Sequence, residues 1–138
     1  MKTEYIDTLP EDWQPTAQVF AAMGDATRQK ILLLFGPDEE LSIKDIADIF
    51  PLSRTAIVHH LLVLERAGVL ESRREGKAAL YSLREDKVLE AVDRLRTYIL
   101  EEFPSKGEKA AASGASSSAS PAFVGGQGTS GNLAQGRR

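Results

Sequence analysis

The sequence contains no cysteine and only two histidines, and these absences restrict its chemistry. Without cysteine the chain forms no disulfide, iron–sulfur cluster or thiolate metal site. No stretch approaches the roughly 18 uncharged apolar residues that span a bilayer, and the first five residues do not resemble a signal peptide. We therefore expect a cytoplasmic protein without a membrane partner, and its 138 residues, 42% of them hydrophobic, provide one modest core.

Positive charge is scarce overall and concentrated in one segment. The formal net charge is −3, which taken alone argues against a nucleic-acid partner. Residues 1–103 hold 13 Lys or Arg against 19 Asp or Glu, whereas residues 53–84 hold six against three. A basic segment in an otherwise acidic chain is compatible with contact to DNA phosphates.

Composition and apolar periodicity divide the chain into three parts. Residues 1–11 are an N-terminal extension, and residues 12–103 carry the pattern of a folded domain. From Pro104 onward Ala, Ser and Gly dominate. A segment of that composition buries too little apolar surface to offset its ordering entropy, so we predict a disordered tail over 104–138.

Helix caps and stop signals predict five helices in the folded part. They are expected at residues 12–23, 26–35, 42–50, 54–67 and 86–103. Ser42 with Asp45 three residues later forms a capping-box pattern, and Ser53 is placed to cap the fourth helix before Gly68 ends it. The apolar side of the first helix is expected to carry Trp13, Ala17, Phe20 and Ala21, and that of the third Ile43, Ile46, Ala47, Ile49 and Phe50.

The apolar period changes to two after the fourth helix. Residues 69–74 and 78–83 flank a tight turn at Glu75-Gly76, which predicts a β-hairpin. Two helices joined by a short turn and followed directly by a hairpin make a winged helix-turn-helix. We therefore predict a mainly α fold with a small β-hairpin, the wing.

The fourth helix has the two faces that a DNA-reading helix needs. Ile57, Leu61 and Leu64 share one stripe toward the core, while Val58 and Leu62 belong to the outward face. The predicted DNA-binding residues are Ser53, Arg54, Thr55, Val58 and His59 on this helix and Arg73, Arg74 and Lys77 in the wing.

Each predicted contact follows from side-chain chemistry. The planar fork of Arg54 pairs with guanine O6 and N7, and Val58 suits a thymine methyl group. Thr55 or His59 would reach a base edge or a phosphate, whereas Ser53 would cap the helix and touch a phosphate. The wing cations would contact phosphates or the minor groove, which positions the protein without specifying sequence.

Two amphipathic helices carry more apolar surface than a monomer usually exposes. We predict a homodimer interface made by Trp13, Phe20, Val92, Leu95, Ile99 and Phe103. The alternative is that the first and last helices pack against each other within one chain.

Several strings, in this order and spacing, resemble the ArsR/SmtB family of bacterial repressors. They are Phe20–Leu34, Leu41–Ala47, Leu52–Leu61 (LSRTAIVHHL), Leu64–Leu70, Arg74–Lys77 and Tyr81–Leu83. The resemblance implies a winged-helix homodimer that binds a palindromic operator in double-stranded DNA and is released by an effector. It implies no catalysis, and no catalytic constellation is visible in the sequence.

The chain departs from that family at its known metal sites. Ser42 and Lys44 occupy the string where metal-sensing members carry cysteine, and the last predicted helix has no histidine. Because zinc and softer metals prefer nitrogen and sulfur ligands, we expect no metal, no cofactor and an unidentified effector of another kind. Apolar Val58 and Leu62 leave open an alternative function, in which the winged helix binds another protein.

Overall fold

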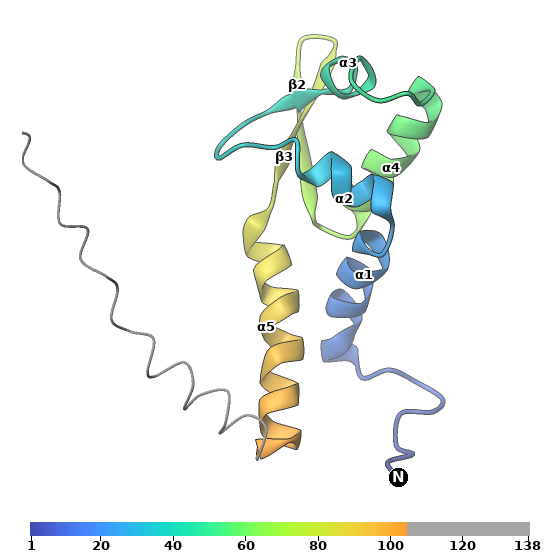
Figure 1. Cartoon of the computed structure of the whole chain (residues 1–138), viewed down its shortest axis with the longest axis vertical. Coiled ribbons are helices and arrows are strands. Elements are labelled where there is room, and N and C mark those ends of the chain that lie inside the picture. Colours follow the sequence, from blue (N-terminus) through green and yellow to red (C-terminus); the bar gives the residue numbers. More distant parts are fainter. Residues whose placement is uncertain (105–138) are drawn as a thin grey trace, which may run out of the picture.

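The computed structural model describes residues 1–104, so most of the predicted tail lies outside the described residues. Figure 1 shows α1 and α5 side by side, with the remaining helices and the sheet beyond one end of this pair. In chain order the elements are η1 (Glu11–Trp13), α1 (Gln14–Met23), α2 (Ala26–Leu32), β1 (Leu41–Ser42), α3 (Ile43–Ala47), α4 (Arg54–Arg66), β2 (Leu70–Glu75), β3 (Ala78–Leu83) and α5 (Glu85–Glu102). The predicted five helices and hairpin are confirmed.

The three strands form an antiparallel sheet in the order β1-β3-β2. Tyr81 of β3 lies between Leu41 of β1 and Ser72 of β2. Glu75 pairs with Ala78, so the two turn residues are Gly76 and Lys77, one position later than predicted. Gly76 has a φ of 59°, a conformation that glycine adopts without the steric cost of a Cβ atom.

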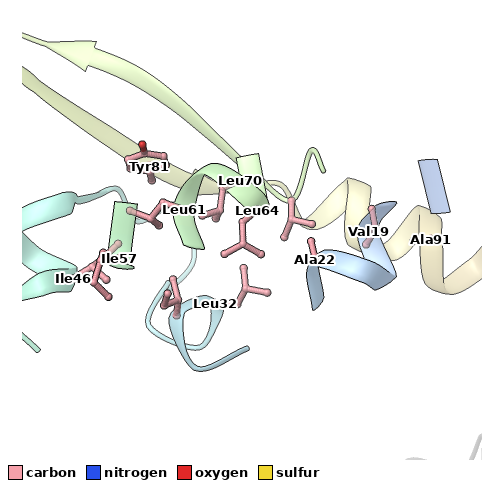
Figure 2. Packing of buried hydrophobic residues seen from close by; sticks show 12 residues of the cluster. Val19, Ala22, Leu32, Ile46, Ile57, Leu61, Leu64, Leu70, Tyr81 and Ala91 are labelled. Atoms are coloured by element: carbon pink, nitrogen blue, oxygen red, sulfur yellow. The ribbon is translucent and has the colours of Figure 1, made fainter. Parts of the chain in front are cut away.

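The core is centred on α4 and joins α2, α3 and the base of the wing (Figure 2). Its almost fully buried side chains are Ile31, Ile46, Ile57, Leu61, Leu64, Val69 and Leu70. The predicted stripe of Ile57, Leu61 and Leu64 is confirmed, because all three have no exposed surface. These contacts fix the orientation of α4 and thereby of its opposite face.

The predicted face of the first helix is wrong, whereas that of the third is confirmed for Ile43, Ile46, Ala47 and Phe50 and wrong only for Ile49. In α1 the buried residues are Thr16, Val19 and Ala22, because this face packs on α4 and α5. In α3 the regular helix ends at Ala47, and the chain turns so that the side chain of Ile49 is 65% exposed. An apolar pattern does not say which of two adjacent faces its neighbours will cover.

Side-chain caps define the helix starts. The Asp25 carboxylate accepts a hydrogen bond from the Arg28 amide at 3.0 Å, and the Ser53 hydroxyl accepts one from the Ala56 amide at 3.1 Å. The predicted capping box is present, with Ser42 Oγ 3.1 Å from the Asp45 amide and the Ser42 amide 2.8 Å from Asp45. Within residues 1–104, no helix combines the length and apolarity needed to cross a membrane.

These caps predict acid sensitivity of folding. Hydrogen bonds from backbone amides hold the pKa values of Asp25 and Asp45 below their usual 3.8. A depressed folded-state pKa contributes stability above the unfolded value, and that contribution is lost as pH falls through the folded value. We expect a melting temperature that is nearly constant between about pH 7 and 5 and falls below about pH 4, measured by circular dichroism.

The Asp25→Asn variant tests the origin of this effect. Asparagine caps a helix about as well as aspartate but has no carboxyl group to titrate. The variant should keep most of its stability at pH 7 and lose it less steeply below pH 4 than the unchanged protein. An equally steep loss would show that the Asp25 cap does not contribute to the acid response.

Candidate nucleic-acid interface

The outward face of α4 is open along the helix. Arg54, Thr55 and His59 are exposed, and the side chains of Val58 and Leu62 each keep 39% of their surface accessible. Since Ile57, Leu61 and Leu64 are buried, α4 has the predicted division between an anchoring face and a free face. The free face combines hydrogen-bonding groups with two apolar groups.

The N-terminus of α4 favours an anion. Ser53 uses its hydroxyl oxygen to cap the helix, and the first turn contains no acidic residue. The helix dipole places partial positive charge at this end, and Arg54 adds a full charge. A phosphate beside Ser53 and Arg54 therefore meets a favourable electrostatic environment.

The two histidines of α4 point to different surroundings. His59 is exposed on the free face, whereas His60 is half-buried toward α2. Nδ1 of His60 lies 3.4 Å from Nη1 of Arg28, and Arg28 Nε donates to the Ala22 carbonyl oxygen at 2.6 Å. His60 therefore helps to hold α4 against α2, whereas the exposed His59 is free to contact a ligand.

The wing cations divide between the two faces of the sheet. Ser72 donates a hydrogen bond to Glu65 of α4 at 2.8 Å, so this face of β2 is the one beside the helix. Successive strand residues point to opposite faces, which places Arg74 with Ser72 and places Arg73 on the far side. Lys77 lies in the turn, where its side chain is exposed.

Arg73 makes contacts that the sequence did not indicate. Its Nε and Nη2 donate to the two carboxylate oxygens of Glu40 at 2.5 and 2.9 Å, and Nη2 lies 3.3 Å from Glu75. Glu40 directly precedes β1, 33 positions earlier in the chain. No local signal in the sequence shows which basic residue Glu40 meets in the folded chain.

Arg84 connects the base of the wing to α5. Its guanidinium lies 3.1 Å from a Glu71 oxygen and 3.0 Å from an Asp86 oxygen. The hydrogen bonds from Arg84 hold the pKa of Asp86 below its usual 3.8. The sequence analysis counted Arg84 only as part of the basic segment. In the structure its charge is paired with Glu71 and Asp86 of the same chain.

The predicted dimer residues fall into two groups. Phe20, Val92, Leu95, Ile99 and Phe103 are exposed, and the last four, which lie on α5 or at its C-terminal cap, have accessible fractions between 41% and 49%. Trp13 is half-buried within the chain instead, with its ring edge-on to Tyr98 at a centroid distance of 5.4 Å and Arg94 above it at 5.3 Å. Val92, Leu95, Ile99 and Phe103 form an apolar stripe along α5, the α5 stripe, which the rest of residues 1–104 leaves partly uncovered.

Comparisons with known proteins agree with this arrangement. Residues 23–73, which include α2 to α4 and most of β2, match a family described as a helix-turn-helix domain. The solved structure of an ArsR-like transcriptional regulator from Rhodococcus sp. RHA1 is 30% identical, with a TM-score of 0.57, over 75% of this chain and 92% of that one. Two relatives with named regulatory roles are also similar in sequence.

One relative is the cadmium resistance transcriptional regulatory protein CadC homolog of Staphylococcus aureus, 34% identical over 64% of this chain and 73% of the relative. Another is the transcriptional repressor SdpR of Bacillus subtilis, 38% identical over 59% of this chain and 89% of the relative. The chain belongs to the ArsR family of transcriptional regulators. Membership confirms the predicted winged helix-turn-helix, DNA as the partner and a regulatory rather than an enzymatic role.

Within this ArsR-family regulator, residues 1–104 contain no group of three or more His, Asp or Glu side chains placed to hold a metal ion. Ser42 and Lys44 are engaged in other contacts. Ser42 takes part in the capping box, and the Lys44 ammonium lies 2.7 Å from Asp48. The hydrogen bond from Lys44 to Asp48 raises the pKa of the lysine, which keeps it protonated.

Proposed function

We propose that this regulator is a homodimeric repressor that binds a palindromic operator through α4 and the wing. The division of α4 into a buried stripe and an open polar face carries the proposal. Two copies related by a two-fold axis would present their α4 helices to major grooves about 34 to 36 Å apart. The name of the relative SdpR as a transcriptional repressor supports the direction of regulation.

Within this interface, Arg54 and His59 would read base edges, and Val58 would contact a thymine methyl group. Ser53, Thr55, Arg74 and Lys77 would contact phosphates and fix the register of the protein on DNA. All of these side chains are exposed around α4 and the wing. The proposed dimer interface consists of Phe20 and the α5 stripe. Trp13 would support it indirectly, because its ring packs against Tyr98 of α5.

The proposed effector is not a thiophilic metal. The CadC homolog is named for cadmium resistance, but the present chain has no cysteine to offer a soft metal a thiolate. At the string where cysteines would stand, Lys44 carries a protonated ammonium that cannot act as a ligand. An effector of different chemistry is therefore proposed.

Binding to promoter DNA tests the proposal directly. The purified protein should shift DNA from the region upstream of its own gene, and the shift should weaken steeply as salt rises. Absence of salt-sensitive binding would contradict the proposed function. It would favour use of the apolar Val58 and Leu62 surface for a protein partner.

Arg54→Ala is expected to weaken operator binding by about five- to 150-fold and to relax the preference at one base pair, because a bidentate contact to guanine is lost. Fluorescence anisotropy with promoter DNA and with single-base-pair variants measures both effects. Lys87→Ala is the control, since Lys87 is exposed on α5 beside the groove between α1 and α5, away from the proposed dimer residues. If Arg54→Ala bound all sequences with unchanged affinity, Arg54 would not read a base.

A further inference from the structure

The contact between Arg73 and Glu40 differs from an ordinary surface ion pair. It has two hydrogen bonds, at 2.5 and 2.9 Å, and Glu75 adds a third charged group to the network. The Glu40 side chain is only 35% exposed. A bidentate arginine–carboxylate pair within a network is the kind of exposed pair that has a measurable effect.

This contact spans the whole sheet. Arg73 of β2 is opposite Leu80 of β3, and Leu80 is in turn opposite Ser42 of β1. Glu40 reaches Arg73 from just before β1, so the bond joins the two outer strands across the central one. Within the sheet, each outer strand otherwise pairs only with β3, and β1 is just two residues long. The pair therefore restrains the twist of the wing relative to the helical body.

The charges of Arg73 and Glu40 also neutralise each other. Hydrogen bonding to Arg73 holds the pKa of Glu40 below its usual 4.5, so the carboxylate is ionised at neutral pH. A DNA phosphate would have to displace this carboxylate to bind the Nε–Nη2 edge of Arg73, the edge that makes a bidentate contact with Glu40. Arg74 and Lys77 carry no comparable partner in residues 1–104, since Arg74 approaches only the Lys77 carbonyl oxygen, at 3.5 Å.

We propose that Glu40 is a positioning residue for DNA binding, which holds Arg73 and thereby sets the wing so that Arg74 and Lys77 meet the phosphates. In this proposal, which rests on the proposed function, Arg73 holds the wing in position and does not itself bind a DNA phosphate. Glu40 acts at a distance from DNA, in a loop that belongs to neither α4 nor the wing.

Salt dependence distinguishes a positioning residue from a phosphate contact. Each phosphate contact that is removed lowers the magnitude of the slope of log affinity against log salt by about one. Glu40→Gln and Arg73→Gln should each weaken binding to promoter DNA about two- to fivefold and leave this slope unchanged. Because both remove the same contact, the double variant should be no weaker than either single variant. Arg74→Gln should instead lower the slope.

The opposite pattern would overturn the proposal. If Arg73→Gln lowered the slope as Arg74→Gln does, while Glu40→Gln bound DNA as well as or better than the unchanged protein, Arg73 would be a phosphate contact that Glu40 restrains. Exchange of the charges in Glu40→Arg with Arg73→Glu should recover part of the affinity. No recovery, together with additive losses in the double variant, would also count against positioning.

A measurement on the free protein separates this proposal from the proposed function. Backbone amides of β2 and β3 near the turn should exchange with deuterium faster in Glu40→Gln and Arg73→Gln than in the unchanged protein. Glu101→Gln is the control, since Glu101 is exposed near the end of α5 and lies outside this network, and it should leave the exchange of these amides unchanged. Unchanged exchange in both variants would reject the positioning role, even if the unchanged protein bound no DNA.

Discussion

Ile99→Glu is expected to convert the proposed dimer into monomers and to lower the affinity for promoter DNA by roughly 100-fold or more, because two linked half-site contacts become independent. Ile99 lies within the exposed stripe of α5 and has 44% of its surface accessible. In a two-fold symmetric interface, the variant would bury one unpaired carboxylate from each copy. Sedimentation velocity at micromolar protein concentration measures the assembly, and fluorescence anisotropy measures the affinity.

Thr97→Glu is the control for this experiment. Thr97 is exposed on the same helix but is not part of the stripe, and it lies instead beside the groove between α1 and α5. The same added charge there should leave the assembly and the DNA affinity close to those of the unchanged protein. A monomeric unchanged protein, or an Ile99→Glu variant that assembles normally, would contradict both the dimer and the palindromic operator.

Much of the fold could be predicted because its signals are local. Ser42 with Asp45 and the Ser53 cap are patterns within four residues, and the structure confirms their hydrogen bonds. Gly68 has a φ of 80°, which explains why α4 ends where the glycine stands. The stripe of buried residues on α4 was predictable for the same reason, since helical spacing determines which side chains share a face.

The parts that could not be predicted depend on contacts between distant segments. The face of α1 that is buried, with Val19 and Ala22, is selected by α5, which lies some 70 residues further along the chain. The bond from Glu40 to Arg73 depends on β1 pairing with β3. Asp38, Glu39 and Glu40 all precede β1, and only the tertiary arrangement determines that Glu40 is the one that meets Arg73.

The same distinction applies to the candidate interface. The outward direction of Arg54 and His59 follows from the position of the buried stripe on one helix. The separation of Arg73 from Arg74 follows from strand alternation only once the register of the sheet and the place of α4 beside it are known. A count of positive charge in the wing therefore overstates the charge that the wing can offer to DNA.

Leu61→Ala is expected to reduce the free energy of unfolding by about 2 to 5 kcal/mol, because the truncation leaves a cavity in a packed core. Leu61 has no exposed surface and lies where α4 meets the other buried side chains (Figure 2). For a domain of this size, such a loss is a large part of the total stability. Urea unfolding followed by circular dichroism measures it, and a lower midpoint with an unchanged slope is expected.

Leu62→Ala is the matched comparison, because it removes the same atoms one position further along the same helix. Leu62 is 39% exposed on the free face, so its truncation should change the free energy of unfolding by no more than about 0.5 kcal/mol. The helix propensity of the two substitutions is the same, which leaves burial as the difference between them. Equal destabilisation by both variants would mean that the outward face of α4 is covered in solution, and it would contradict the proposed DNA interface.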